Sequence, residues 1–184
     1  LIAAAGTPLF GICGGYQMLG RKVRDPLHTE SEHDETAGFG YLPTATTFAA
    51  QKRLRQVAAS ADFNFLGARI SGKNLLGYEI HMGQTDFLEE ACRPFHIVQK
   101  DNFAADGAVS ADGLVIGTYI HGIFDDDDFR RCLLNRLRVH RGWSETPVQY
   151  RYREAKERSY NRLAETVRKS LDMERLREIV EGDQ

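Results

Sequence analysis

One cysteine stands at the centre of a glycine-rich turn near the start of the sequence. Residues 11–15 read Gly-Ile-Cys-Gly-Gly, with Cys13 in the middle. This is the nucleophile-elbow pattern, in which small residues permit a sharp strand-to-helix turn that lifts a reactive side chain above a sheet. The helix N-terminus and the backbone N–H groups of the turn are expected to lower the pKa of the thiol. The N–H of Gly14 could also hold an oxyanion.

A thiolate that transfers acyl groups needs a base, and histidine is the usual one near neutral pH. His121 directly follows the apolar run 114–120, which predicts a core strand, and active sites of α/β proteins lie at the carboxyl ends of such strands. We therefore expect His121 to be the partner of Cys13. His81 is the second candidate, because glycines at 77 and 83 flank it, and a binding role and a structural role are equally open.

The remaining cysteines and the loop histidines do not predict further chemistry. Cys132 is expected on the apolar face of a helix, and Cys92 lies among charged residues without an elbow, so neither is a candidate nucleophile. His28 and His33 stand beside carboxylates, but a solvated loop explains them better than a metal site. The acidic run 125–128 is expected to begin a helix. We therefore predict no metal.

The pattern of apolar residues predicts an α/β chain. We expect a helix tail with a glycine cap at 1–6, strands at 8–12 and 114–120, a helix at 16–23, a surface loop at 25–38, β-hairpins or sheet extensions between 39 and 98, a helix starting at 125–128 and ending before Gly142, a helical stripe from 150 to 171, and a last helix capped by Asp172 through Val180.

Bulk composition favours one globular domain. Of the 184 residues, 42% are hydrophobic and 27% are charged, as in soluble folded proteins. The net charge of -2 argues against a nucleic-acid partner. No apolar run is long enough for a membrane-spanning helix or a signal peptide, so we expect a cytoplasmic protein with no membrane partner. Three cysteines without CxxC spacing predict neither a disulfide framework nor a zinc site.

Three segments resemble one known family. The elbow Gly11-Ile-Cys-Gly-Gly-Tyr-Gln-Met-Leu-Gly20 is similar to that of class I glutamine amidotransferases of the cobyric acid synthase type. The segments Gly77-Tyr-Glu-Ile-His-Met-Gly83 and Gly117-Thr-Tyr-Ile-His-Gly-Ile-Phe-Asp125 resemble the family's other two signatures, in the same order. The charged tail is also similar, so the resemblance covers nearly the whole chain.

The resemblance implies a fold and a reaction. The fold is a flavodoxin-like α/β core with β-hairpin additions and a helical C-terminal tail, N-terminally truncated, in one amidotransferase domain over residues 1–184. The ATP-dependent synthetase domain of the family is absent, so this domain needs no cofactor, and ATP and Mg²⁺ belong to the synthetase. Glutamine hydrolysis would supply ammonia for amidation of four peripheral carboxylates of adenosylcobyrinic acid a,c-diamide, a corrinoid, giving adenosylcobyric acid.

The resemblance also assigns roles to residues. Cys13 attacks glutamine, His121 protonates the departing ammonia, and the N–H of Gly14 helps to hold the oxyanion. Gln17 matches a position that contacts glutamine, and His81 and Gly83 fall where a glutamine-binding loop is expected.

Two departures from the broader class matter. Ile123 stands where classical members carry a glutamate, which implies a Cys-His dyad and leaves open what orients His121. A second oxyanion donor normally lies upstream of Leu1, so the chain alone can be inactive.

Other functions remain compatible with these residues. The glutaminase subunit of lipid II amidation shares a similar elbow, and cobyrinic acid a,c-diamide synthase is another neighbour. A non-catalytic amidotransferase-like interaction module and a cysteine peptidase on a similar fold are alternatives from other classes. Turnover of glutamine rather than peptide would discriminate the amidotransferases from the peptidase.

Overall fold

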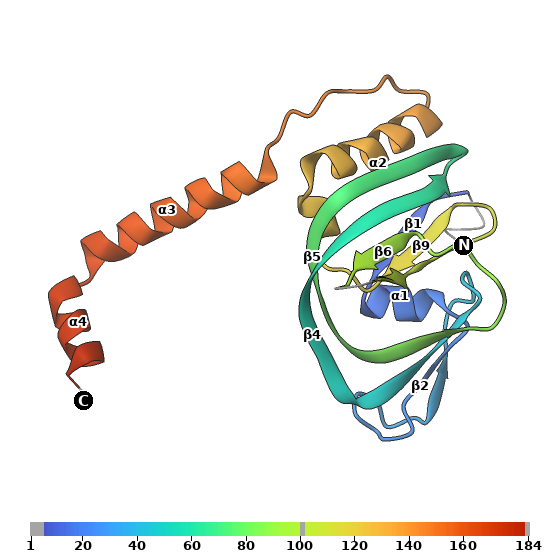
Figure 1. Ribbon diagram of the computed structural model, residues 1–184, viewed down its shortest axis with the longest axis horizontal. Helices are drawn as coiled ribbons and strands as arrows, with labels where there is room; N and C mark the ends of the chain where they lie inside the picture. Colours follow the sequence, from blue (N-terminus) through green and yellow to red (C-terminus); the bar gives the residue numbers. More distant parts are fainter. Residues whose placement is uncertain (1–5, 100–101, 183–184) are drawn as a thin grey trace. The chain divides into compact units, whose positions relative to one another are not determined.

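The computed structural model describes residues 6–99 and 102–182 (Figure 1). The predicted helix tail at 1–6 lies almost entirely outside these residues. The structure divides the chain into two compact units, with the division between Pro147 and Val148. Its helices are α1 (Gly14–Leu19), the 3-10 helix η2 (Ile123–Asp125), α2 (Asp127–His140), α3 (Tyr152–Ser170) and α4 (Met173–Glu181). Its strands are β1 (Leu9–Ile12), β2 (Lys22–Arg24), β3 (Glu35–Ala37), β4 (Thr44–Phe65), β5 (Ala68–Phe87), β6 (Phe95–Val98), β7 (Phe103–Asp106), β8 (Ala108–Val109) and β9 (Val115–Thr118).

A small sheet carries the predicted elbow. Within the described residues its strand order is β1-β9-β8, and β1 and β9 are parallel, with Ile12 opposite Thr118. Both strands are short and apolar, as expected for strands covered on both faces. Because parallel strands end at the same edge, Cys13 and His121 follow neighbouring strand ends. The two predicted core strands are confirmed.

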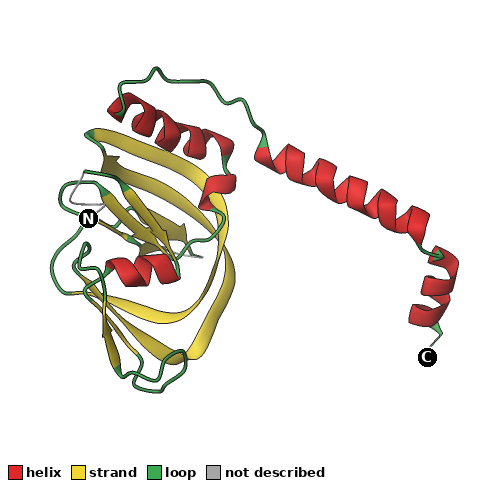
Figure 2. Ribbon diagram, turned by 180° about the vertical axis from the view of Figure 1, so that it is seen from behind, coloured by secondary structure: helices red, strands yellow, loops and turns green. Residues whose placement is uncertain are grey.

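Alternate residues of β9 face two separate hydrophobic clusters. Ile116 belongs to the larger cluster, which includes Phe129 and Leu133 of α2. Val115 belongs to the smaller cluster, which includes Tyr16 of α1. Helix α1 and helix α2 therefore cover opposite faces of the small sheet, as Figure 2 also shows. This layered arrangement confirms the α/β class.

A long antiparallel hairpin dominates the second sheet. Strands β4 and β5 pair over most of their length and bend around the small sheet (Figure 2). The described part of this sheet has the order β3-β2-β4-β6-β7, with β5 paired to β4. The pairing places Arg55 opposite Glu79 and Arg53 opposite His81. The predicted hairpin additions are confirmed, and β5 brings residues 77–83 to the carboxyl ends of β1 and β9.

Two expectations about residues 16–38 were wrong in their boundaries. The helix predicted at 16–23 begins at Gly14 and ends at Leu19, because Gly20 is extended and residues 22–24 form β2 beside β4. The predicted loop at 25–38 contains strand β3, which pairs with β2 and places Glu35 within ion-pair distance of Lys22 and Arg24. Opposite charges on paired strands stabilise strand pairing, so the charged composition did not indicate a loop alone.

The predicted helices of the second half are present. The Asp126 side chain accepts a hydrogen bond from Phe129 N at the start of α2, and the Asp172 side chain accepts one from Arg175 N at the start of α4. Cys132 packs against the larger hydrophobic cluster, as expected. Helices α3 and α4 belong to the second unit. The assignment of one amidotransferase domain to residues 1–184 stays a prediction, since compactness alone does not decide which residues act together. None of the helices in the described ranges has the length and apolar character needed to cross a membrane.

Candidate active site

Cys13 lies at a strained turn between β1 and α1. Its backbone has φ 53° and ψ −113°, a conformation with a positive φ that non-glycine residues rarely adopt. The Cys13 N–H donates to Thr118 O at 2.9 Å, and Gln17 N donates to the Cys13 carbonyl oxygen at 3.1 Å. The turn therefore ends the strand and starts the helix within one residue. This is the geometry of the predicted elbow.

The thiol of Cys13 is partly buried and points toward β5. Its Sγ donates to Ile80 O at 3.5 Å. Burial raises the pKa of the Cys13 thiol above its ordinary value, and the hydrogen bond with Gly14 N–H opposes that rise only in part. The expected lowering of the pKa was therefore wrong in net direction, because desolvation outweighs the backbone N–H. A thiol of this kind needs a base to remove its proton.

His121 lies beside Tyr78 at the end of β9. The two residues exchange backbone hydrogen bonds, Tyr78 N to His121 O at 3.1 Å and His121 N to Tyr78 O at 2.8 Å. Their rings stack, with centroids 4.9 Å apart and planes within 8°. Burial, and next the nearby His81, lower the pKa of His121 below its ordinary value. The imidazole is therefore neutral at neutral pH and able to accept a proton.

Cys13 and His121 both contact one edge of β5. Tyr78 and Ile80 direct their backbone groups away from β4, toward His121 and Cys13 respectively. These contact points are two residues apart, about 7 Å along the strand. Among the described residues, the buried Nε2 of His121 has no hydrogen-bond partner, so it makes no hydrogen bond to the Cys13 thiol.

Gln17, His81 and Gly83 gather around Tyr119. The Gln17 Nε2 donates to the Tyr119 hydroxyl at 3.4 Å, and the His81 ring stacks on Tyr119 with centroids 3.8 Å apart. A side chain at Gly83 would force Gln17 to move, because a Cβ there would lie 2.4 Å from Gln17 Nε2 and 3.0 Å from the Tyr119 hydroxyl. The structure therefore brings together the three residues expected to contact substrate.

His81 is held by one hydrogen bond, and its second ring nitrogen has no hydrogen-bond partner among the described residues. Its Nδ1 lies 2.7 Å from Gly83 O and therefore donates to this carbonyl, and its Nε2 lies 3.7 Å from a carboxylate oxygen of Glu79. Glu79 is 2% exposed and also forms an ion pair with Arg55. Burial raises the pKa of Glu79, but His81 and Arg55 outweigh burial and lower it below its ordinary value. His81 thus lies beside the buried Glu79–Arg55 ion pair.

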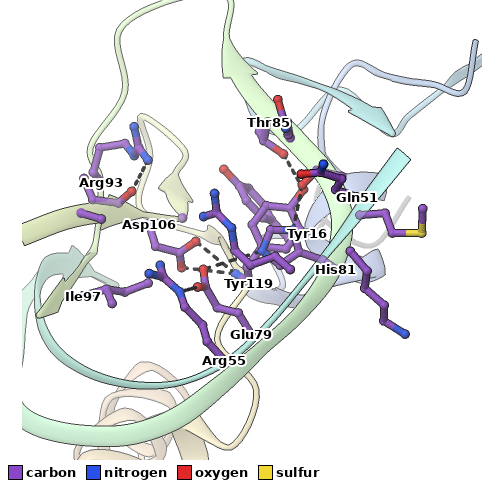
Figure 3. Close-up of a pocket in the computed structure, with 18 residues that line it drawn as sticks. Tyr16, Gln51, Arg55, Glu79, His81, Thr85, Arg93, Ile97, Asp106 and Tyr119 are labelled. Carbon is purple, nitrogen blue, oxygen red and sulfur yellow. Dashed lines mark hydrogen bonds and ion pairs between the residues drawn. The ribbon is translucent and has the colours of Figure 1, made fainter. Parts of the chain in front are cut away.

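A cavity of about 470 Å³ opens beside this ion pair (Figure 3). Figure 3 shows Glu79 with Arg55, and Asp106 with Tyr119, as bonded pairs in its wall. Among the described residues, neither Cys13 nor His121 lines the cavity. The lining residues are Tyr16, Gln51, Lys52, Arg53, Arg55, Glu79, His81, Met82, Gly83, Gln84, Thr85, Arg93, Ile97, Ala104, Ala105, Asp106, Gly107 and Tyr119.

Sequence reasoning missed four residues that shape the site. Tyr78 and Glu79 lie inside the segment chosen for His81, and Tyr119 lies two residues before His121, so their positions beside candidate residues were a signal. Arg55 had no such signal, because only the β4–β5 register places it opposite Glu79.

The loop histidines lie apart from these clusters. His28 pairs with Asp34 at 3.1 Å and is exposed. No group of three or more His, Cys, Asp or Glu side chains within residues 6–99 and 102–182 is arranged to hold a metal ion.

Comparisons with known proteins agree on one family. Residues 2–129 match the model of the CobB/CobQ-like glutamine amidotransferase domain. The chain is 42% identical over 184 residues to a cobyric acid synthase of Streptococcus sanguinis, and 44% identical over 178 residues to one of Dehalococcoides mccartyi. These alignments cover 97% and 95% of this chain but 35% of each relative, so the chain spans about a third of the curated relatives' length.

Among solved structures, the chain is similar to PurLQS of Thermotoga maritima, with a TM-score of 0.48 and 16% identity. That similarity covers 74% of this chain and 65% of the other. The assignment rests on the matched residues 2–129 and on the identity to the curated relatives. The chain belongs to the family of CobB/CobQ-like glutamine amidotransferase domains.

Proposed function

We propose that this chain releases ammonia from glutamine through a thioester on Cys13, with His121 as the base. The observation that carries the proposal is that both residues contact the same edge of β5, two residues apart, where the thiol contacts Ile80 O and the imidazole stacks on Tyr78. The raised pKa of Cys13 and the lowered pKa of His121 suit a thiol that is protonated at rest beside a neutral imidazole.

The first half of the reaction forms the thioester. His121 takes the Cys13 proton as the sulfur attacks the side-chain amide carbon of glutamine, and the N–H of Gly14 donates to the oxyanion. The imidazolium then gives its proton to the amide nitrogen as the C–N bond breaks. The products are ammonia and a glutamyl thioester.

The second half restores the enzyme. His121 takes a proton from water, the hydroxide attacks the thioester carbon, and the C–S bond breaks. The proton returns to the sulfur, and glutamate leaves. Gln17, His81 and Gly83 would bind glutamine in the first half and the glutamyl group in the second, since they form one cluster around Tyr119.

The ammonia would be used in a second reaction. Relatives that share 42% and 44% identity are named cobyric acid synthase, and this chain covers about a third of their length. We therefore propose that an ATP- and Mg²⁺-dependent synthetase domain of the same protein uses the ammonia to amidate peripheral carboxylates of adenosylcobyrinic acid a,c-diamide, giving adenosylcobyric acid. The names of these relatives favour this acceptor over lipid II.

Alkylation by 6-diazo-5-oxo-L-norleucine, a reactive glutamine analogue, tests the glutaminase site. The analogue would be applied to this chain and to a chimera in which the chain replaces the matching third of the Streptococcus sanguinis relative. Peptide mapping should locate the added mass on Cys13, and excess glutamine should block it. Exposed Cys92 in the same chain is the internal control for unselective alkylation.

Two outcomes separate the alternatives. Labelling of Cys13 in the chimera, together with glutamate release from glutamine, supports the proposal, and ATP-dependent amidation of the corrinoid by the chimera tests the acceptor. If iodoacetamide reaches Cys13 in the chimera but the glutamine analogue does not, the glutaminase proposal is wrong. A non-catalytic module or a peptidase then explains the site better.

A further inference from the structure

The unexplained feature of the site is what orients the His121 ring. Cysteine nucleophiles usually work with a base that a third group holds in place. Ile123 occupies the position two residues after His121. Among the described residues, His81 and His28 have a carboxylate oxygen within 4 Å of a ring nitrogen, but His121 has no such ion-pair contact. Its buried Nε2 also has no hydrogen-bond partner in the described ranges. A carboxylate therefore does not orient this imidazole.

Tyr78 makes the contacts that a third group would otherwise make. Two backbone hydrogen bonds, at 2.8 and 3.1 Å, fix the His121 main chain to Tyr78 in both directions. The two rings are nearly parallel, with their centroids 4.9 Å apart, and this stacking restricts rotation of the imidazole about its side-chain torsions. Stacking restricts the ring without occupying its nitrogens, which leaves them available for proton transfer.

The backbone of β5 is shaped for this close approach. A Cβ at Gly77 would lie 2.4 Å from the His121 carbonyl oxygen, so a larger residue would push β5 away from β9. Tyr78 itself is 45% exposed, which is unusual for a residue whose role is to fill a core. Two residues further along, Ile80 O accepts the hydrogen bond from the Cys13 thiol. One short segment of β5 therefore positions both reacting side chains.

We propose that Tyr78 is a positioning residue, whose ring holds the His121 imidazole in the orientation that exchanges a proton with Cys13. This inference rests on the proposed glutaminase function and extends it. The ring, not the hydroxyl, makes the contact. Tyr78→Phe should therefore retain activity, whereas Tyr78→Leu, whose side chain is apolar but not aromatic, should lose it.

The kinetic test compares three variants of the chimera described above with its parent. Tyr78→Leu should lower kcat for glutamate release by about 10- to 100-fold, within the range that general acid–base catalysis contributes, with KM changed less than about 3-fold. Tyr78→Phe should stay within about 3-fold of the parent kcat. Leu76→Ala, which alters an exposed side chain on the same strand, is the matched control and should leave kcat unchanged.

A double mutant separates positioning from general weakening of the strand. If Tyr78 acts through His121, then Tyr78→Leu should cost almost nothing further in a His121→Asn background. The readout in that background is the rate at which 6-diazo-5-oxo-L-norleucine alkylates Cys13. An equal loss in both backgrounds would show that Tyr78 supports the fold instead, and would overturn the inference.

An activity-independent readout keeps the two proposals apart. In this chain, the ring-proton resonances of His121 should show the upfield shift of a stacked ring, retained in Tyr78→Phe and lost in Tyr78→Leu. A parent chimera without glutaminase activity would refute the proposed function, and the inference with it. An active parent whose Tyr78→Leu variant keeps full kcat would refute the inference alone.

Discussion

Two regions along β5 differ in how far their polar groups are paired. At the edge facing β1 and β9, the Cys13 thiol makes one 3.5 Å contact and His121 Nε2 has no hydrogen-bond partner in the described residues. Within the cavity wall, the Glu79 carboxylate is paired with Arg55 and His81 Nδ1 donates to Gly83 O, although His81 Nε2, like His121 Nε2, has no hydrogen-bond partner in the described residues. Groups that exchange protons need free positions, whereas the buried Glu79 carboxylate is stabilised by being paired.

Strand geometry explains how one segment serves both regions. Successive side chains of a strand point to opposite faces, so Tyr78 and Glu79 are separated although they are adjacent in sequence. The pairing of Arg55 with Glu79 holds this register. A shift of one residue would exchange the two faces, placing Glu79 beside His121 and Tyr78 in the cavity wall.

The largest effect is expected from removing the free base. His121→Asn should lower kcat for glutamate release by about 100- to 10,000-fold, because general acid–base catalysis is lost. His140→Asn changes a histidine at the far end of α2 and should be silent. A His121→Asn variant with full activity would assign the base to another residue.

The pH dependence of the parent's glutaminase activity further tests His121 as the base. A base must be unprotonated, and burial lowers the pKa of His121 below its ordinary value of 6.5. Activity should therefore persist as the pH falls through 6.5 and decline only below it. The measurement is a pH profile of kcat/KM for glutamine. An acid limb above pH 6.5 would contradict the lowered pKa.

The next largest effect is expected from breaking the ion pair between Arg55 and Glu79. Arg55→Met leaves the buried Glu79 carboxylate without its guanidinium, and should lower the free energy of unfolding by about 2–3 kcal/mol. Urea denaturation at neutral pH measures the change. Arg53→Met, at an exposed neighbouring position on β4, is the control.

The sign of the pH effect follows from the lowered pKa of Glu79. The stabilisation from this carboxylate is present above its ordinary pKa of 4.5 and is lost as the pH falls through the lowered value. The difference between the parent and Arg55→Met should therefore shrink in acid. A difference that does not depend on pH would attribute the loss to packing of the arginine stem.

A smaller effect is expected from crowding the cluster around Tyr119. Gly83→Ala places a methyl group 2.4 Å from Gln17 Nε2, which must move. If Gln17 binds substrate, KM for glutamine should rise about 10-fold, a loss of about 1.4 kcal/mol in binding, with kcat less affected. Met18→Ala, next to Gln17 but exposed, is the control. A fall in kcat at unchanged KM would indicate that Gln17 acts in catalysis rather than in binding.

Local sequence patterns predicted the elements whose formation depends on residues close together in the sequence. The elbow, the strand before His121 and the capped helix after it follow from glycines, apolar runs and acidic caps, which act within a few residues. The net rise in the pKa of Cys13 was not predictable, because burial depends on β5, 67 residues away in sequence. The roles of Tyr78 and Arg55 depend on strand pairing for the same reason.

The segment 25–38 shows the same limit for a charged stretch, and it supplies the smallest predicted effect. Asp25 is buried, and its carboxylate accepts hydrogen bonds from Thr29 N, Glu30 N and Ser31 N at 2.7–2.9 Å. Burial raises the pKa of Asp25, but these hydrogen bonds outweigh burial and hold it at about 2. Among the described residues, the hydrogen bonds to the Asp25 carboxylate all come from its own segment.

Asp25→Ala should therefore lower Tm by a few degrees and leave kcat and KM for glutamine unchanged, with Asp34→Ala, an exposed carboxylate in the same segment, as the control. The Tm difference should be full above the ordinary aspartate pKa of 3.8 and vanish as the pH approaches 2, since the folded-state pKa is the lower one. Thermal unfolding followed by circular dichroism across this range measures it. A loss of activity without a change in Tm would show that the segment 25–38 takes part in the reaction, and the division between free catalytic groups and satisfied supporting groups would then have to be drawn elsewhere.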